Sequence, residues 1–100
     1  APEELKAVLN NDFRRLETAV QHVWQLHYQG EYQKAYRLGI TLGPAGMAPA
    51  LYSKLIYTTH LVSNPDEKEK LFLEVEQEIS KFFLMAQGYD LEMPIRNPDA

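Results

Sequence analysis

The pattern Gly30-x-Tyr32-x-x-Ala35 constrains the fold of this chain more than any other feature. It follows a long helical pattern that ends at Tyr28, and a second helical pattern begins directly after it. Gly30 can adopt the left-handed backbone conformation that ends a helix without strain. Tyr32 and Ala35 fall on one side of the next helix, where the small Ala35 lets two antiparallel helices approach closely. We therefore predict a helical hairpin that bends at Gly30 and buries Ala35 between its first and second helices.

The segment before the bend carries one apolar stripe with helical spacing. Pro2 suits a first helical turn, and the acidic residues after it complement the positive end of the helix dipole. Asn10, Asn11 and Asp12 are poor helix formers, so an arm followed by a shorter helix is the alternative. We predict a single helix over residues 2–28. Its stripe consists of Leu5, Leu9, Phe13, Leu16, Val20, Val23 and Leu26 or His27.

Two further helices are predicted before the second hairpin turn. The second helix is expected over residues 31–41, where Gly39 costs about 1 kcal/mol relative to alanine. Close packing against the first helix is the simplest reason to tolerate that cost. Glycine and proline at positions 43, 44 and 46 predict a flexible turn over residues 42–47. The third helix is expected over residues 48–62, with Pro49 in its first turn.

The boundary at Asn64 is the clearest in the chain. Asn64 is a good helix N-cap, Pro65 suits the first helical position, and Glu67 has the spacing of a capping box. The fourth helix is expected over residues 65–87 and an irregular tail over residues 89–100. No strand pattern occurs, so the predicted fold is all-α, with four helices as two antiparallel hairpins in one domain over residues 1–88.

The spacing of the two turns carries a resemblance to a known family. Gly30 and Asn64 lie 34 residues apart, which is the period of the tetratricopeptide repeat. The pattern Gly30-x-Tyr32-x-x-Ala35 also resembles the turn of that family, where a glycine, an aromatic residue and an alanine recur at these offsets. The resemblance covers about residues 19–86, although Glu69 stands where the second unit would have its packing alanine. It implies helical hairpins that present a groove to a peptide or protein partner.

Composition excludes several classes of function. The formal net charge is −4, and the excess acid lies in residues 51–100. Nucleic-acid binding needs a basic stripe, which the sequence lacks. No apolar run approaches the roughly 20 residues of a membrane span. The absence of cysteine excludes disulfides and thiol chemistry and suits both the cytoplasm and the bacterial periplasm, so the compartment stays open.

The histidines and carboxylates form no catalytic or metal-binding pattern. His22 and His27 lie five residues apart, about 140° around a helix, which prevents them from sharing a metal ion. Glu74 and Glu78 face the same way, but the Glu-x-x-His pattern of di-iron bundles is absent. We interpret these two glutamates as a solvent-exposed acidic face. We therefore expect a non-enzymatic protein with no catalytic residue, no metal and no cofactor.

Aromatic residues concentrate in the middle of the chain and suit either a core or a protein interface. We predict a non-enzymatic, tetratricopeptide-like adaptor that binds a protein or peptide. The alternative is a small helical-bundle enzyme or ligand-binding protein with an aromatic pocket near Trp24, His27, Tyr28 and Tyr57. The candidate partner-binding residues are Trp24, Tyr28, Tyr32, Tyr36, Tyr52 and Tyr57.

The start of the first helix predicts self-association. A second helix of about ten residues covers only about 15 Å of the first, so Leu5, Leu9 and Phe13 need another partner. Soluble monomers generally avoid such an exposed apolar patch, and a two-fold partner is its commonest cover. We predict a homodimer with Leu5, Leu9 and Phe13 as the contact, or alternatively with the central tyrosines.

Overall fold

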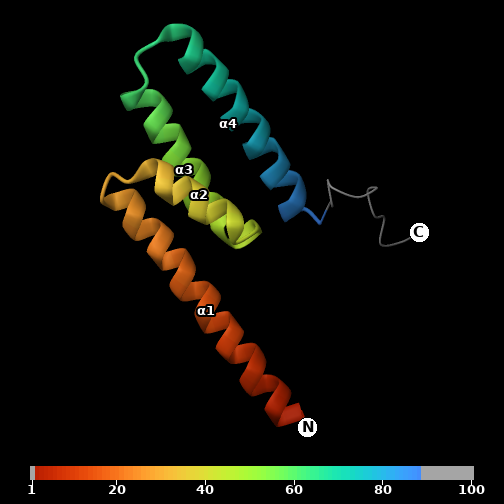
Figure 1. The fold of residues 1–100 in the computed structure, drawn as a ribbon. Helices are drawn as coiled ribbons and strands as arrows, with labels where there is room; N and C mark the ends of the chain where they lie inside the picture. The colour runs from red at the N-terminus through yellow and green to blue at the C-terminus, as the bar shows by residue number, and fades with distance from the viewer. Residues whose placement is uncertain (1, 89–100) are drawn as a thin grey trace, which may run out of the picture.

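The computed structural model describes residues 2–88, which form four α-helices and no strand. Figure 1 shows that each helix runs antiparallel to the one before it. The predicted all-α fold with two antiparallel hairpins is confirmed, and the predicted irregular tail lies outside the described residues. The helices are α1 (Pro2–Tyr28), α2 (Tyr32–Thr41), α3 (Pro44–Leu61) and α4 (Pro65–Ala86).

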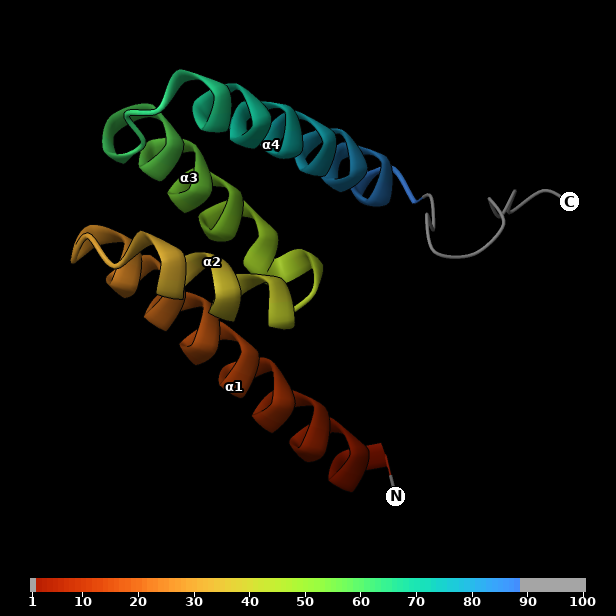
Figure 2. The same ribbon diagram turned by 45° about the horizontal axis from the view of Figure 1, so that its top comes forward.

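The first helix, α1, is continuous over 27 residues, as predicted, and passes through Asn10, Asn11 and Asp12 without a break. Only its C-terminal part packs against the rest of the molecule, where Val23 and His27 are buried. Residues 2–18 are all exposed, and we call them the N-terminal arm. Figures 1 and 2 show this arm extending past the ends of α2 and α3.

The bend after α1 has the hydrogen bonds of a Schellman motif. Gly30 has a φ of 82°, and its N–H donates to the His27 carbonyl at 3.0 Å. The Glu31 N–H donates to the Leu26 carbonyl at 2.9 Å. These bonds pair carbonyl groups at the end of α1 that would otherwise lack a donor. The left-handed conformation of residue 30 explains why a glycine occupies this position. Ala35 on α2 is fully buried, as predicted.

The crossing of α2 and α3 is the most extensive contact between two helices among the described residues. Gly39 and Gly46 allow the two backbones to approach closely there. A Cβ atom on Gly39 would lie 2.6 Å from Ala50 Cβ and 2.7 Å from the Gly46 carbonyl oxygen. A Cβ atom on Gly46 would overlap the carbonyl group of Gly39. The prediction that Gly39 packs against the first helix was therefore wrong, because the backbone that meets it belongs to α3.

The third helix begins at Pro44, four residues before the predicted start, so the flexible turn predicted over residues 42–47 was wrong. Gly43 takes a φ of 69° as the N-cap, and Pro44 occupies the first helical position, where its missing N–H is not needed. Gly46 therefore lies inside the helix, at the crossing with Gly39. Pro49 lies within the helix and is buried, although its ring removes one intrahelical hydrogen bond.

The fourth helix begins as predicted. Pro65 is its first residue, and the Asn64 side chain accepts a hydrogen bond from the Glu67 N–H at 3.0 Å. Val75 is its one buried residue. The backbone of α4 packs against α3 and not against α1, and the Glu78 side chain also accepts a hydrogen bond from Tyr36 of α2. Figure 2 shows the four helices in sequence order across the molecule, with α1 and α4 on its two sides.

Asn64→Ala should lower the free energy of unfolding by about 1 kcal/mol, because the Glu67 N–H loses its acceptor. Urea denaturation followed by circular dichroism measures the change. Ser63→Ala is the matched control, since Ser63 is the exposed neighbour outside the cap. Equal destabilisation by both variants would contradict the capping role.

Candidate groove between α2, α3 and α4

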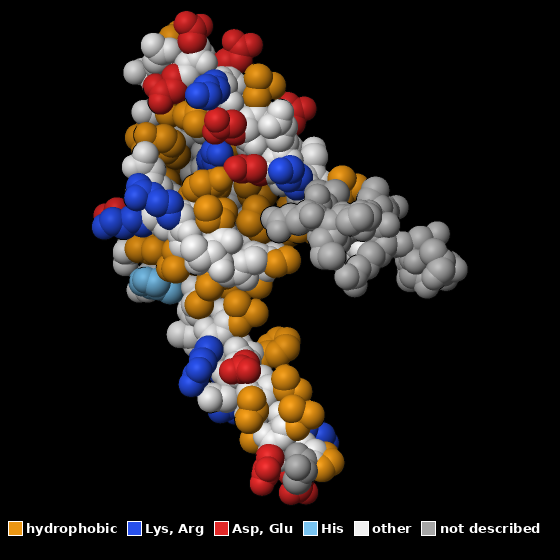
Figure 3. All heavy atoms as spheres, turned by 45° about the vertical axis from the view of Figure 1, so that its right-hand side comes forward, with side chains coloured by type: hydrophobic (Ala, Val, Ile, Leu, Met, Phe, Trp, Pro, Cys, Tyr) orange, Lys and Arg blue, Asp and Glu red, His pale blue; other side chains and the backbone are white. Residues whose placement is uncertain are grey.

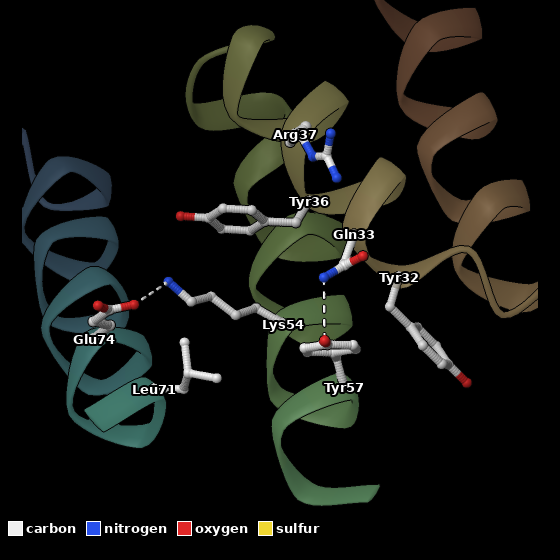
Figure 4. A pocket seen from close by; sticks show the side chains of 8 residues that line it. All are labelled: Tyr32, Gln33, Tyr36, Arg37, Lys54, Tyr57, Leu71 and Glu74. Atoms are coloured by element: carbon white, nitrogen blue, oxygen red, sulfur yellow. Dashed lines mark hydrogen bonds and ion pairs between the residues drawn. The ribbon is translucent and has the colours of Figure 1, made fainter. Parts of the chain in front are cut away.

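A half-open groove of about 290 Å³ lies between α2, α3 and α4, and we call it the central groove (Figure 4). Its α2 side comes from residues with the i, i+1, i+4, i+5 spacing of one helix face. α3 contributes two residues three positions apart, and α4 does the same. The lining residues are Tyr32, Gln33, Tyr36, Arg37, Lys54, Tyr57, Leu71 and Glu74.

Lys54 of α3 is the charged centre of the groove, and its side chain is only 12% exposed. Its Nζ atom lies 3.2 Å from Glu74 Oε2 and 3.2 Å from both carboxylate oxygens of Glu78. Tyr36 of α2 donates its hydroxyl proton to Glu78 Oε1 at 2.5 Å. Lys54 also lies 4.7 Å from the centre of the Tyr36 ring. This network ties α2 and α3 to α4.

The interpretation of Glu74 and Glu78 as a solvent-exposed acidic face was only partly right, because their side chains are 42% and 28% exposed but both are paired with a lysine. Both carboxylates turn toward α3 and bind the same ammonium group (Figure 4 shows Glu74). Their spacing alone predicts that they share a face of α4. It does not reveal that a lysine from another helix lies opposite that face.

The network shifts the pKa of two of its members. Burial raises the pKa of Tyr36, and the hydrogen bond and negative charge of Glu78 raise it further. Burial alone would lower the pKa of Lys54, but the hydrogen bonds and charges of Glu78 and Glu74 outweigh it, so the pKa is raised. Both groups therefore hold their protons more tightly in the folded state.

The free energy of unfolding should consequently fall as the pH rises above about 10. The ordinary pKa values are 10.0 for tyrosine and 10.5 for lysine. Above them the unfolded chain releases protons that folded Tyr36 and Lys54 retain, so deprotonation favours unfolding. Urea denaturation between pH 8 and pH 11 tests this, with Tyr36→Phe/Lys54→Met as the comparison. The pH dependence should be steeper in the wild type, and equal slopes would contradict the assignment.

The other end of the groove is formed by Tyr32 and Tyr57. Gln33 Nε2 donates to the Tyr57 hydroxyl at 3.1 Å, and Figure 4 shows this bond, with the Tyr32 ring pointing away from Lys54. A second hollow of similar size shares Tyr32, Gln33, Arg37 and Tyr57 and continues to the bend at Gly30. The central groove and this second hollow together form an elongated, open groove rather than a closed cavity.

A separate aromatic cluster surrounds His27. The ring centre of His27 lies 4.8 Å from that of Tyr52, 5.3 Å from Tyr28 and from Tyr32, and 5.8 Å from Trp24. Its Nδ1 shares a 2.8 Å hydrogen bond with Ser53 Oγ. Burial lowers the pKa of His27, which favours the neutral imidazole.

The six candidate partner-binding residues thus fall into two places. Tyr36 and Tyr57 line the central groove, and Trp24, Tyr28 and Tyr52 belong to the cluster around His27. Tyr32 belongs to both, because it lines the groove and its ring also lies 5.3 Å from that of His27. For the alternative aromatic pocket, the structure gathers Trp24, His27 and Tyr28 but places Tyr57 in the groove.

Sequence reasoning missed the groove residues that are not tyrosines. Gln33, Arg37, Lys54 and Leu71 all line it. The shared helix face of Gln33 and Arg37, four residues apart, is the one signal available in the sequence. Finding Lys54 and Leu71 requires knowing how α3 and α4 pack.

Within residues 2–88, no three metal-ligating side chains gather at one point. None of the helices in this part of the chain is long and apolar enough to cross a membrane. Comparisons with protein families, with characterised proteins and with solved structures found no match to this chain.

Proposed function

We propose that this protein is a non-enzymatic interaction module whose central groove binds a peptide segment of a partner protein. One observation carries the proposal: three tyrosines and Leu71 line a half-open, elongated groove on three packed helices. Tyrosine provides a large, rigid contact surface with a polar hydroxyl, and it is enriched where binding energy concentrates. The contact of α1 with α3 as well as α2 agrees with the stacked hairpins that the tetratricopeptide resemblance implies.

The charges in the groove indicate what kind of segment it accepts. Lys54 already binds Glu74 and Glu78, so its charge is balanced within the protein. Arg37 lies exposed on the groove's α2 side and supplies a positive charge there. An apolar side chain suits the surface of Tyr57 and Leu71, and an acidic residue suits Arg37. We therefore expect the partner segment to carry an aromatic or aliphatic residue close to a carboxylate.

Selection from a phage-displayed peptide library, followed by fluorescence titration, tests the proposal. Selected peptides should share an apolar residue near an acidic one. Tyr57→Ala should raise their dissociation constant about tenfold or more, as expected for an interface hot spot. Tyr28→Ala is the matched control, since Tyr28 is 79% exposed and lies outside the groove.

Two outcomes would contradict the proposal. A selection that enriches no peptide would leave the groove without a binding role. Peptides that lose affinity with Tyr28→Ala but bind normally to Tyr57→Ala would place the binding site at the cluster around His27.

A further inference from the structure

The long helix α1 is anchored to the rest of the molecule only near its C-terminal end. The N-terminal arm is exposed, and Figure 3 shows hydrophobic side chains gathered along one side of it. More than half of the surface is exposed at each residue of the predicted dimer contact, Leu5, Leu9 and Phe13. Val23 and His27 are the two buried residues of α1. The docking of a 27-residue helix onto α2 and α3 therefore rests on few side chains, and one of them is a titratable histidine.

His27 lies in an enclosed site where three helices meet. It is 6% exposed, and its Nδ1 shares the 2.8 Å hydrogen bond with the Oγ atom of Ser53, a fully buried residue of α3. The four aromatic rings of the cluster come from α1, α2 and α3, and their centres lie between 4.8 Å and 5.8 Å from that of the imidazole. The His27 side chain thus fills the junction through which α1 contacts the other two helices.

Among the described contacts of His27, no side chain carries a charge that could offset a proton on the imidazole. The groups that face it are Ser53 of α3 and the rings of Trp24 and Tyr28 of α1, Tyr32 of α2 and Tyr52 of α3. All of them are uncharged at acidic pH. Glu31, the nearest carboxylate in the sequence, is exposed and pairs with Lys34 at 3.8 Å. An imidazolium here would lose hydration without gaining a counter-ion.

We propose that His27 makes the docking of α1 sensitive to pH. The neutral imidazole holds the C-terminal end of α1 against α2 and α3, and its protonation loosens that end while the other three helices stay packed. The contacts that join those three helices do not include His27. Gly39 and Gly46 make the crossing of α2 and α3, and Lys54 binds both glutamates of α4. The proposal does not depend on peptide binding in the central groove, so either can fail without the other.

Proton linkage gives the direction and the size of the effect. The ordinary pKa of histidine is 6.5, and burial lowers the pKa of docked His27 below that value. When α1 is released, His27 meets water and binds a proton more readily, so acid favours release and the docked state is most stable above pH 6.5. Between the two pKa values, the equilibrium constant for opening should rise up to about tenfold for each unit by which the pH falls.

Nuclear magnetic resonance of the full chain, from about pH 7 down to about pH 5, tests the proposal above the range in which most carboxylates titrate. The imidazole signals of His27 should titrate with a midpoint below 6.5. Hydrogen-exchange protection of the amides from Val23 to Tyr28, corrected for the intrinsic pH dependence of exchange, should fall severalfold or more over this range. Protection around Lys54 in α3 and Val75 in α4 should stay the same.

The matched variants replace a buried and an exposed histidine of the same helix. His27→Gln keeps a hydrogen-bonding side chain near Ser53 but cannot bind a proton, so protection of α1 should no longer depend on pH between about 5 and about 7. His22→Gln is the control, since His22 is exposed on α1 and its substitution should leave the pH dependence in place. Emission of Trp24, the one tryptophan of the chain, should shift to longer wavelength at low pH in the wild type and in His22→Gln.

Three results would overturn the proposal, and the first needs no variant. A His27 midpoint at or above 6.5 would mean that the aromatic rings or the C-terminal end of the α1 dipole stabilise the imidazolium. Protection of α1 that does not change with pH, or that falls equally in His27→Gln, would show that His27 does not control docking. Protection that falls equally in all four helices would show unfolding of the whole molecule rather than release of α1.

Discussion

Gly46→Ala should destabilise the protein by about 2 kcal/mol, although alanine favours a helix more than glycine does. The added methyl would overlap the Gly39 carbonyl group, which belongs to the backbone of α2 and cannot rotate away. Overpacking of this kind costs up to about 3 kcal/mol. The gain in helix propensity offsets about 1 kcal/mol of that cost. A loss of stability in Gly46→Ala would therefore indicate that α2 and α3 meet at these two glycines, whereas a gain would indicate that they do not.

Thermal unfolding followed by circular dichroism measures the effect. A loss of about 2 kcal/mol corresponds to a melting temperature lower by about 8–16 °C in a chain of this size. Ala45→Ser is the matched control, since it adds one atom at the exposed neighbour of Gly46. A Gly46→Ala variant more stable than the wild type would contradict the glycine crossing.

Lys54→Met should destabilise the protein by about 1–3 kcal/mol and loosen α4. The substitution keeps most of the buried stem but leaves Glu78 and Glu74 facing each other without a positive charge. Removing one partner of a buried ion pair costs about 3–5 kcal/mol. Exposed pairs contribute far less, and the two glutamates are partly exposed, which reduces the expected cost. Val75, the one buried residue of α4, then becomes its main anchor.

Urea denaturation measures this loss, and hydrogen exchange of the α4 amides shows whether that helix opens first. Adding Glu78→Gln to Lys54→Met should recover part of the stability, because it removes one uncompensated charge. Lys70→Met is the control at an exposed lysine of α4. If Lys70→Met and Lys54→Met lowered the free energy of unfolding equally, the network around Lys54 would contribute no more stability than an exposed lysine does.

The fold could be predicted from the sequence wherever the signal was local. Gly30 ends α1 because a glycine can take its φ of 82°. Asn64 begins α4 because its side chain can reach the Glu67 N–H. The apolar stripe from Leu5 to Val23 predicted one long helix despite its polar middle. These features depend on residues within a few positions of one another.

The errors arose where the decisive contact joined distant segments. From the sequence, Gly46 suggested a turn. In the structure it lies inside α3, where a side chain would collide with the Gly39 backbone of α2. Glu74 and Glu78 indicated a solvated face because Lys54, their common partner, is at least 20 residues away in the sequence. Periodicity identifies which residues share a face but not what lies opposite that face.

The candidate site was predictable only in part, for the same reason. The six aromatic residues could be chosen from the sequence as a group. Their division between the groove and the cluster around His27 depends on how α2 and α3 cross, which places Tyr57 beside Gln33 and Tyr52 beside His27. The tetratricopeptide resemblance implies a groove without specifying its lining residues, and it stays a prediction.

Peptide binding in the central groove is the central claim, and nuclear magnetic resonance tests it most directly. A selected peptide is titrated into the ¹⁵N-labelled protein while amide shifts are recorded. The account predicts that the largest changes occur at Gln33, Tyr36, Lys54 and Tyr57, from helices α2 and α3, with smaller changes elsewhere. Largest changes along the N-terminal arm or around Trp24 and Tyr28, with the groove amides unmoved, would contradict it.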